Sequence, residues 1–288
     1  MGGNPHEYLE LSDQRVLVTG GHGFLGKHIC HALAQVGAIP LPVGRADADL
    51  TDPTAIHSLF DRLSNPPLVI LAAAVGGGIG WMQAPPATAL AGNLSANTNL
   101  LEVACKRGVR RLLGVSSACA YAKLAQQPMV ESDVYEGEPE PTNGPYGHSK
   151  RILMRHGAAL FEEFGFDCCF AIPTNMYGPG ESFDPARAHV VGALVRRFVE
   201  AQAAGVPVVT CWGTGKATRD LLYAPDAGRF LARLLAVGGG TEPINMGSGV
   251  ERTIAEIAST IATAAGYTGE LRWDADKPDG MPRKVLEL

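Results

Sequence analysis

Short apolar runs alternate with longer segments of helical periodicity along the first part of the chain. The apolar runs at 15–19, 38–43, 68–74, 111–115 and 167–172 have the length and side-chain types of strands. Apolar residues recur at helical spacing in 27–36, 55–63, 85–107 and 146–164. The order therefore predicts an α/β fold with a doubly wound, Rossmann-like parallel sheet and right-handed crossovers.

The alternation loosens after residue 181, which indicates a second and smaller unit. Helices are expected at 189–204, 226–237 and 253–265, and strands at 206–211, 243–246 and 270–273. We expect residues 1–172 to form a dinucleotide-binding domain to which a segment of about 218–246 returns. Residues 173–288, mainly 173–217 and 247–288, would then form a substrate-binding lobe over the carboxyl edge of the sheet.

Composition and charge exclude several classes of function. The 288 residues are 46% hydrophobic and 18% charged, and no apolar run is long enough to span a bilayer. The net charge of −5 argues against binding to nucleic acid or to a membrane surface. The N-terminus lacks the pattern of a secretory signal, so a cytoplasmic location is expected. The six cysteines lack metal-ligand spacing, and no metal site is expected.

A glycine-rich turn connects the first strand to the first helix. It reads Gly20-Gly21-His22-Gly23-Phe24-Leu25-Gly26. Glycines allow a tight turn and a close approach of the backbone, and the helix N-terminus can meet a pyrophosphate. Ala72 and Ala73, at the end of the third strand, are small enough to leave room for a ligand. In this strand–turn–helix context, the turn predicts a dinucleotide cofactor rather than a plain glycine-rich loop.

The end of the second strand indicates which dinucleotide binds. Arg45 suits the 2′-phosphate of NADP, whereas an acid at this place would suit the ribose hydroxyl of NAD. Asp47 lies close enough in sequence to compete. Asp49 and Leu50 begin the next loop, where an acceptor could take the adenine amino group. The alternative for these acids, especially for Asp52, is an N-cap of the following helix.

A tyrosine and a lysine four residues apart open the helix at 146–164. Tyr146 and Lys150 therefore share a helix face. An ammonium beside a phenol favours the phenolate, so the pKa of Tyr146 is expected to fall towards the working range. With the hydroxyl of Ser117 after the fourth strand, the group predicts redox chemistry at a carbonyl. The alternative is a helix-capping tyrosine with a solvated surface lysine.

Further motifs resemble the extended short-chain dehydrogenase/reductase family that modifies nucleotide sugars, and within it the GDP-L-fucose synthases. The resemblance covers essentially the whole chain from Arg15 on. The segments that carry it are 47–52, 71–77, 140–143, 172–179, 212–215 and 277–284.

The resemblance implies an NADPH-dependent epimerase-reductase that converts GDP-4-keto-6-deoxy-D-mannose to GDP-L-fucose. It implies a homodimer formed through the helices at 85–107 and 146–164. Ser117 and Tyr146 would face the C4 carbonyl, and Cys119 and His189 would be the acid/base pair of the epimerisations. Implied cofactor contacts are Gly20 to Gly26, Arg45, Val115, Ser116, Lys150, Pro173, Thr174, Asn175, Met176 and His189. Implied substrate contacts are Asn175, Arg197, Trp212, Arg219 and Asp279.

Each of these residues also has a structural interpretation. Cys119 could be an inert packed thiol, and His189 could be a helix-start residue bonded to backbone. The remaining alternatives are a surface charge for Arg197, a core position for Trp212 and an ion pair between Arg219 and Asp220. His22 stands where the family can carry an arginine. Alternative functions are action on another GDP-4-keto-sugar such as a heptose, only one of the two steps, or a non-catalytic NADP-binding sensor.

Overall fold

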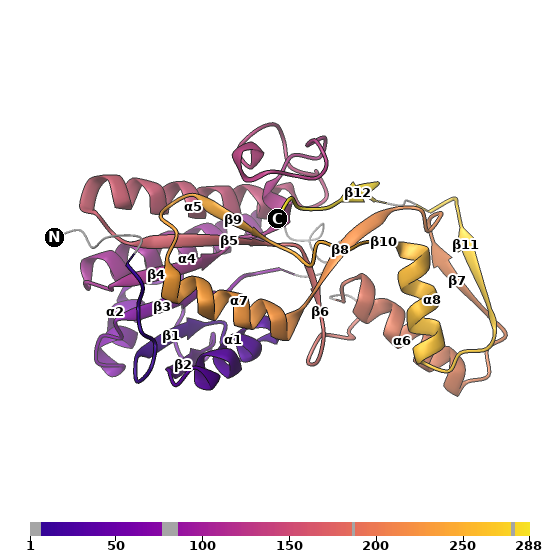
Figure 1. Ribbon diagram of the computed structural model, residues 1–288, viewed down its shortest axis with the longest axis horizontal. Coiled ribbons are helices and arrows are strands. Elements are labelled where there is room, and N and C mark those ends of the chain that lie inside the picture. Colours follow the sequence, from indigo (N-terminus) through magenta and orange to yellow (C-terminus); the bar gives the residue numbers. More distant parts are fainter. Residues whose placement is uncertain (1–6, 77–85, 186–187, 278–279) are drawn as a thin grey trace.

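Six parallel strands form the central sheet, in the order β2-β1-β3-β4-β5-β9 (Figure 1). The computed structural model describes residues 7–76, 86–185, 188–277 and 280–288. The strands are β1 (Arg15–Thr19), β2 (Ile39–Val43), β3 (Leu68–Leu71), β4 (Arg111–Val115), β5 (Cys168–Pro173) and β9 (Pro243–Met246). The strand order reverses between β1 and β3, and ligands bind at such a switch point in open α/β sheets. The predicted doubly wound sheet is confirmed.

Side chains of the central strands pack alternately into two cores, one on each face of the sheet. In β1, Val16 and Val18 belong to one core and Leu17 to the other. Both faces are therefore buried, which explains why these strands are continuously apolar. One face is covered by α1 (Phe24–Gln35) and α7 (Ala224–Val237), the other by α2 (Pro53–Arg62), α4 (Pro86–Lys106) and α5 (Gly144–Phe164) (Figure 1).

Helix α5 approaches the sheet closely because glycines stand at its contacts. A Cβ atom at Gly157 would overlap the ring of Phe170 in β5. A Cβ atom at Gly147 would overlap the carbonyl oxygen of Cys119, in the segment that follows β4. The first turns of α5 are thereby held against the carboxyl end of β4.

A second set of strands lies beyond the carboxyl edge of the central sheet (Figure 1). Strand β8 (Thr218–Tyr223) pairs with β6 (Asn175–Tyr177), β10 (Glu251–Thr253) and β12 (Arg283–Lys284). Strands β7 (Val208–Trp212) and β11 (Glu270–Asp274) pair in parallel, and α6 (Val190–Ala203) and α8 (Ile254–Ala264) share a separate core with β7. After β8 the chain returns through α7 to β9 in the central sheet.

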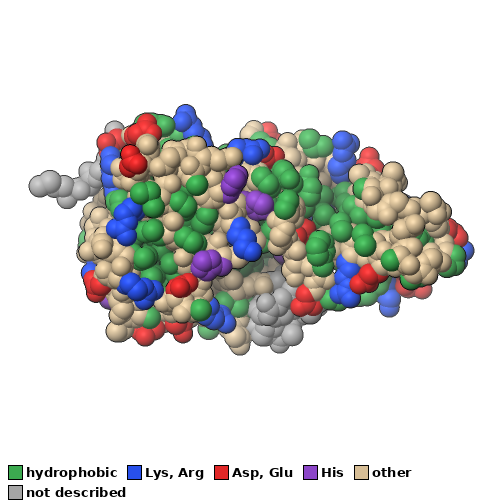
Figure 2. All heavy atoms as spheres, turned by 90° about the horizontal axis from the view of Figure 1, so that it is seen from below, with side chains coloured by type: hydrophobic (Ala, Val, Ile, Leu, Met, Phe, Trp, Pro, Cys, Tyr) green, Lys and Arg blue, Asp and Glu red, His purple; other side chains and the backbone are tan. Residues whose placement is uncertain are grey.

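The face of the molecule in Figure 2 carries charges of both signs, interspersed over its described residues, with histidines near its middle. The mixture is consistent with the small net charge of −5, since 24 basic residues stand against 29 acidic ones. No helix among the described residues is long and apolar enough to cross a membrane.

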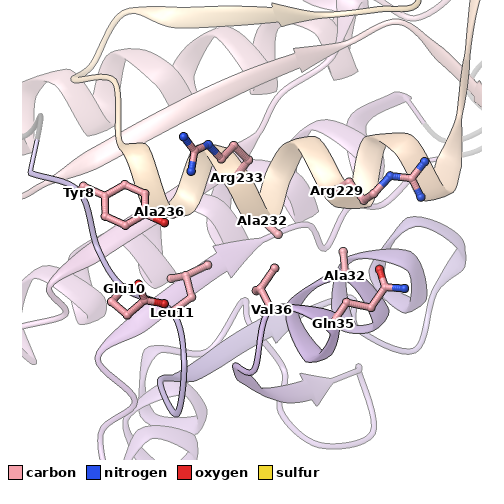
Figure 3. Close-up of a pocket in the computed structure, with 10 residues that line it drawn as sticks. All are labelled: Tyr8, Glu10, Leu11, Ala32, Gln35, Val36, Arg229, Ala232, Arg233 and Ala236. Atoms are coloured by element: carbon pink, nitrogen blue, oxygen red, sulfur yellow. The ribbon is translucent and has the colours of Figure 1, made fainter.

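A pocket opens between the segment around Leu11, α1 and α7 (Figure 3). Its lining combines apolar residues with two arginines, a glutamate and a glutamine: Tyr8, Glu10, Leu11, Ala32, Gln35, Val36, Arg229, Ala232, Arg233 and Ala236. The lining includes none of the site residues predicted from the sequence. The candidate site is therefore built elsewhere, at the carboxyl ends of the strands.

Candidate active site

The glycine turn after β1 has the geometry of an anion-binding turn. Gly20 has a φ of 69°, and a Cβ atom at Gly26 would overlap the Gly20 carbonyl oxygen. At Gly21 a Cβ atom would lie 2.6 Å from the Cα atom of Pro42 in β2. Gly23 is the N-cap of α1; no side chain caps it, and the first turn, which starts at Phe24, carries no acidic residue. The positive end of the helix dipole therefore remains available to a phosphate.

The loops after β2 and β3 surround the expected adenosine end of the cofactor. Asp47 accepts a hydrogen bond from the Gly44 amide at 2.8 Å, and its carboxylate lies 3.5 Å from Nε2 of His22. Arg45 is exposed. Ala72 and Ala73 are half-buried, and the Ala73 amide donates to the Thr19 hydroxyl at 3.3 Å.

The acids that follow Arg45 take local hydrogen bonds. Asp52 accepts from the Thr54 amide at 2.8 Å and caps α2, so the N-cap interpretation is confirmed for Asp52. Asp49 accepts from the amide and hydroxyl of Thr51, and these bonds hold the pKa of its carboxyl below the ordinary value. Leu50 is half-buried and packs against the core under α2 and α4.

The segment after β4 brings the carbonyl-binding candidates together. The Ser117 hydroxyl accepts from the Cys119 amide at 3.2 Å, at the start of a short 3₁₀ helix at 118–120. The Ser117 hydroxyl also acts on the phenol of Tyr146, in the direction that lowers the tyrosine's pKa. Lys150 is 1% exposed, and its ammonium donates to the Val115 carbonyl at 2.8 Å. It lies 5.5 Å from the centre of the Tyr146 ring. The interpretation of Lys150 as a solvated surface residue is therefore wrong.

The pKa of Tyr146 shifts opposite to the expected direction. Burial raises it above its ordinary value; the nearby charge of Cys119 adds to this rise, and the Ser117 hydrogen bond opposes it. Burial also lowers the pKa of Lys150 to about 8. The expected fall in the Tyr146 pKa is therefore wrong, because desolvation by burial outweighs the lowering effect of the Ser117 hydrogen bond. A protonated tyrosine is a proton donor.

Two donors converge on the sulfur of Cys119. The Nδ2 atom of Asn143 lies 3.3 Å from Sγ, and the ammonium of Lys284 lies 3.4 Å from it. By contrast, Cys168 and Cys169 are buried, and burial raises the pKa of both thiols. Cys119 is only half-buried and hydrogen-bonded, which differs from the packing of an inert thiol.

His189 is the N-cap residue of α6, but its side chain makes no capping hydrogen bond. The residue is exposed as a whole, yet protein atoms around the imidazole desolvate its charged form and lower its pKa. The charge of Lys284 lowers this pKa further. One ammonium therefore acts on both His189 and Cys119. Sequence reasoning assigned no role to Lys284 or Asn143, although both lie in segments that carry the family resemblance.

The remaining cofactor-binding candidates lie at or just after the ends of strands near the site. Val115 ends β4 and Ser116 follows it; both are buried, and the Ser116 hydroxyl has no partner among the described residues. Pro173 ends β5, and Thr174 donates to the Asp220 carbonyl at 3.0 Å. The half-buried residues Asn175 and Met176 follow in β6.

The substrate candidates lie on the second unit. Trp212 is 64% exposed at the end of β7, so its interpretation as a core residue is wrong. Arg197 is exposed and donates to the Thr210 carbonyl at 3.0 Å. Arg219 donates to the carbonyls of Thr218 and Met281, each at 2.7 Å. Asp279 lies outside the described residues.

Comparisons with known proteins show the family to which the chain belongs. The model of the NAD dependent epimerase/dehydratase family matches residues 16–247. A probable GDP-L-fucose synthase 1 of Oryza sativa subsp. japonica is 38% identical over 99% of this chain and 87% of its own length. The GDP-L-fucose synthase of Escherichia coli (strain K12) is 38% identical over 96% of this chain and 89% of its own.

Solved structures show the same fold. A GDP-L-fucose synthetase from Naegleria fowleri bound to NADP superposes with a TM-score of 0.87 at 29% identity, over 98% of this chain and 88% of that one. A Campylobacter jejuni GDP-6-OMe-4-keto-L-xylo-heptose reductase has a TM-score of 0.87 at 20% identity, over 100% and 91% of the two chains. From the matched residues and the full-length similarity, the chain belongs to the NAD dependent epimerase/dehydratase family.

Proposed function

We propose that this chain is an NADPH-dependent epimerase-reductase that converts GDP-4-keto-6-deoxy-D-mannose to GDP-L-fucose. The observation that carries the proposal is the convergence of Ser117, Cys119, Tyr146 and Lys150 at the end of β4. Full-length relatives at 38% identity carry the name of this activity. A non-catalytic sensor would not need a hydroxyl pair, a buried lysine and a hydrogen-bonded thiol in one place.

The residues support isomerisation next to a ketone. A carbonyl at C4 acidifies the hydrogens on C3 and C5, so one site can serve both carbons. We assign Cys119, as thiolate, to take such a proton, while the electron pair moves to the carbonyl oxygen. The hydroxyls of Ser117 and Tyr146 would stabilise that enolate oxygen by hydrogen bonding. Protonated His189 would return a proton to the opposite face.

The same residues support reduction. NADPH, when bound, supplies the hydride that reaches C4. Tyr146 would then give its phenolic proton to the new alkoxide, which suits a tyrosine whose pKa is raised by burial. Lys150, fixed on the Val115 carbonyl, places a positive charge beside the resulting phenolate and helps Tyr146 to lose its proton at that moment.

The chain's residues fit this cofactor. The glycine turn presents an uncapped helix N-terminus to the pyrophosphate, and added Cβ atoms would close the turn. Arg45 would hold the 2′-phosphate, and the unpartnered hydroxyl of buried Ser116 supplies a polar atom at the end of β4. The strand-end residues 173–176 and Lys150 would complete the nicotinamide end.

We propose that residues 173–217 and 247–288 form the lobe that binds the GDP-sugar. The exposed ring of Trp212 offers a stacking surface for the base, and Arg197 and Arg219 offer positive charge to the diphosphate. Asn175 and Asp279 complete the proposed substrate contacts. We also propose a homodimer formed through α4 and α5. All six cysteines are free thiols, which suits a reducing, cytoplasmic compartment.

A turnover assay tests the proposed function. Purified protein given GDP-4-keto-6-deoxymannose and NADPH should consume the reduced cofactor and yield GDP-fucose, identified by NMR. Tyr146→Phe should reduce cofactor consumption roughly 10²–10⁴-fold, because the proton donor is removed. Cys119→Ser should stop epimerisation and leave some direct reduction at C4, giving an unepimerised sugar. Wild-type behaviour of both variants would reject the enzyme assignment.

One relative favours a second substrate class. A GDP-L-colitose synthase from Yersinia pseudotuberculosis is 31% identical over 95% of this chain. Its name points to a different sugar joined to the same nucleotide. Parallel assays with another GDP-4-keto-sugar, including a heptose analogue, will separate the alternatives. Turnover of that sugar without turnover of the mannose derivative would change the assigned substrate but not the assigned reaction class.

A further inference from the structure

Lys284 reaches the candidate active site from the far end of the chain. It is separated from Cys119 by 165 residues, yet its ammonium lies 3.4 Å from the cysteine sulfur. Its side chain is half-buried. Three other residues interact with the same sulfur or its charge. The Asn143 amide donates to the sulfur, and the charge of Cys119 acts on Tyr146 and Lys150.

The position of Lys284 is fixed by backbone pairing on both sides. Strand β12, which contains Lys284, pairs with β8, so that Lys284 stands opposite Arg219. The next residues continue as a C-terminal strap, defined here as residues 283–288. The Met129 amide donates to the Val285 carbonyl, and the Met129 carbonyl accepts a hydrogen bond from the Glu287 amide, both at 2.9 Å. A lysine held in this way is delivered to one place rather than sampling the surface.

We propose that Lys284 is a positioning residue for isomerisation, which holds Cys119 as the thiolate that takes the proton from carbon. This inference rests on the proposed function of Cys119. An ammonium that donates to sulfur favours the thiolate over the thiol, and the thiolate is the basic form. The second cation near Cys119, Lys150, already donates to the Val115 carbonyl. The two lysines thus have separate tasks, one on the thiol and one beside the phenol.

The same ammonium also faces His189, and its charge makes the imidazolium a readier proton donor. Lys284 therefore acts on both proposed acid/base residues. It favours the thiolate of Cys119, which can accept a proton, and the neutral imidazole of His189, which has released one. The titratable groups that act around the sulfur are Tyr146 and Lys150 from α5 and Lys284 from β12.

Alkylation of Cys119 as a function of pH tests this assignment without turnover. Iodoacetamide reacts with the thiolate, and mass spectrometry of the peptide that carries Cys119 separates its signal from the other five cysteines. Lys284→Met should raise the pH midpoint of alkylation by about one unit, the lower end of the effect of a neighbouring charge. Lys284→Arg should restore most of the shift. Arg283→Met is the matched control, since Arg283 pairs with Glu251 instead, and its midpoint should equal that of the wild type.

An unchanged midpoint in folded Lys284→Met would overturn the proposal. Lys284→Gln provides a second neutral variant if the methionine variant does not fold, and the same shift is expected. Deuterium incorporation from solvent into C3 and C5 of the sugar should fall about tenfold in the neutral variants at neutral pH, with KM nearly unchanged. If the wild type fails to turn over the sugar but the alkylation shift is found, the substrate assignment fails and the role of Lys284 stands.

Discussion

Lys150 is a buried amine whose protonation should make stability depend on pH. Burial lowers its pKa from 10.5 to about 8 in the folded protein. Between these values the unfolded chain binds more protons than the native one, so the free energy of unfolding rises with pH across this window. Below about pH 8 both states are protonated, and the native state carries the full cost of burying the charge, about 3 kcal/mol.

Urea denaturation of the wild type and of Lys150→Met at several pH values measures this cost. The wild type should gain up to about 3 kcal/mol relative to the variant from pH 7.5 to pH 10, because all other titrating groups are shared. Lys150→Arg is the control, since it stays protonated and should not follow the wild type. A constant difference between the wild type and Lys150→Met would show that the amine is not desolvated.

The residues that could be predicted from sequence are those with local signals. Tyr146 and Lys150 are four apart on one helix, and their shared face follows from helical geometry alone. Lys284 and Asn143 have no such signal, because their role depends on meeting Cys119 across 165 and 24 residues. The direction of the Tyr146 pKa shift was also unpredictable, since desolvation depends on how deeply α5 packs against β4.

At the scale of elements, the C-terminal strap links stability to the site. Leu286 is 3% exposed in the core that contains Met129 and Val134, and it lies two residues from Lys284. Leu286→Ala should lower the free energy of unfolding by roughly 2–5 kcal/mol, as for other buried leucines. Turnover should fall as well, because a loosened strap no longer holds the lysine at Cys119.

Leu59→Ala in α2 provides the comparison for Leu286→Ala. Leu59 is fully buried in the same core, and its replacement by alanine should lower the free energy of unfolding by a similar amount. Assayed well below their unfolding midpoints, the two variants should differ: Leu59→Ala keeps most of its turnover and Leu286→Ala does not. Equal turnover would show that the strap contributes stability alone.

Long periodic elements were predictable, whereas very short strands were not. The helix expected at 85–107 is found at Pro86–Lys106, because its apolar pattern spans several turns. Strands β6 and β10 have three residues each and β12 has two, too few to show any alternation. These strands exist because β8 offers hydrogen-bonding partners, which is a tertiary effect.

At the scale of the whole molecule, sequence-distant segments assemble the site. The glycine turn, the end of β4, the start of α5, the start of α6 and β12 lie along almost the whole chain. The central sheet fixes the first three, since parallel strands end at a common edge. The other two depend on the return of the chain through β8. A lesion at the C-terminus can therefore affect chemistry that begins at residue 117.

The proposed homodimer is the remaining property at this scale, and the exposed side of α5 is where it can be tested. Helices α4 and α5 lie side by side on one face of the sheet, and Ile152 on α5 is 41% exposed (Figure 1).

Light scattering should give twice the 30.3 kDa of one chain for the wild type. Ile152→Glu should give monomers at micromolar concentration, because dimerisation would bury an unpaired carboxylate. Val199→Glu, at an equally apolar and 51% exposed position on α6, should remain dimeric. A monomeric wild type, or dissociation by Val199→Glu alone, would place the interface elsewhere or remove it.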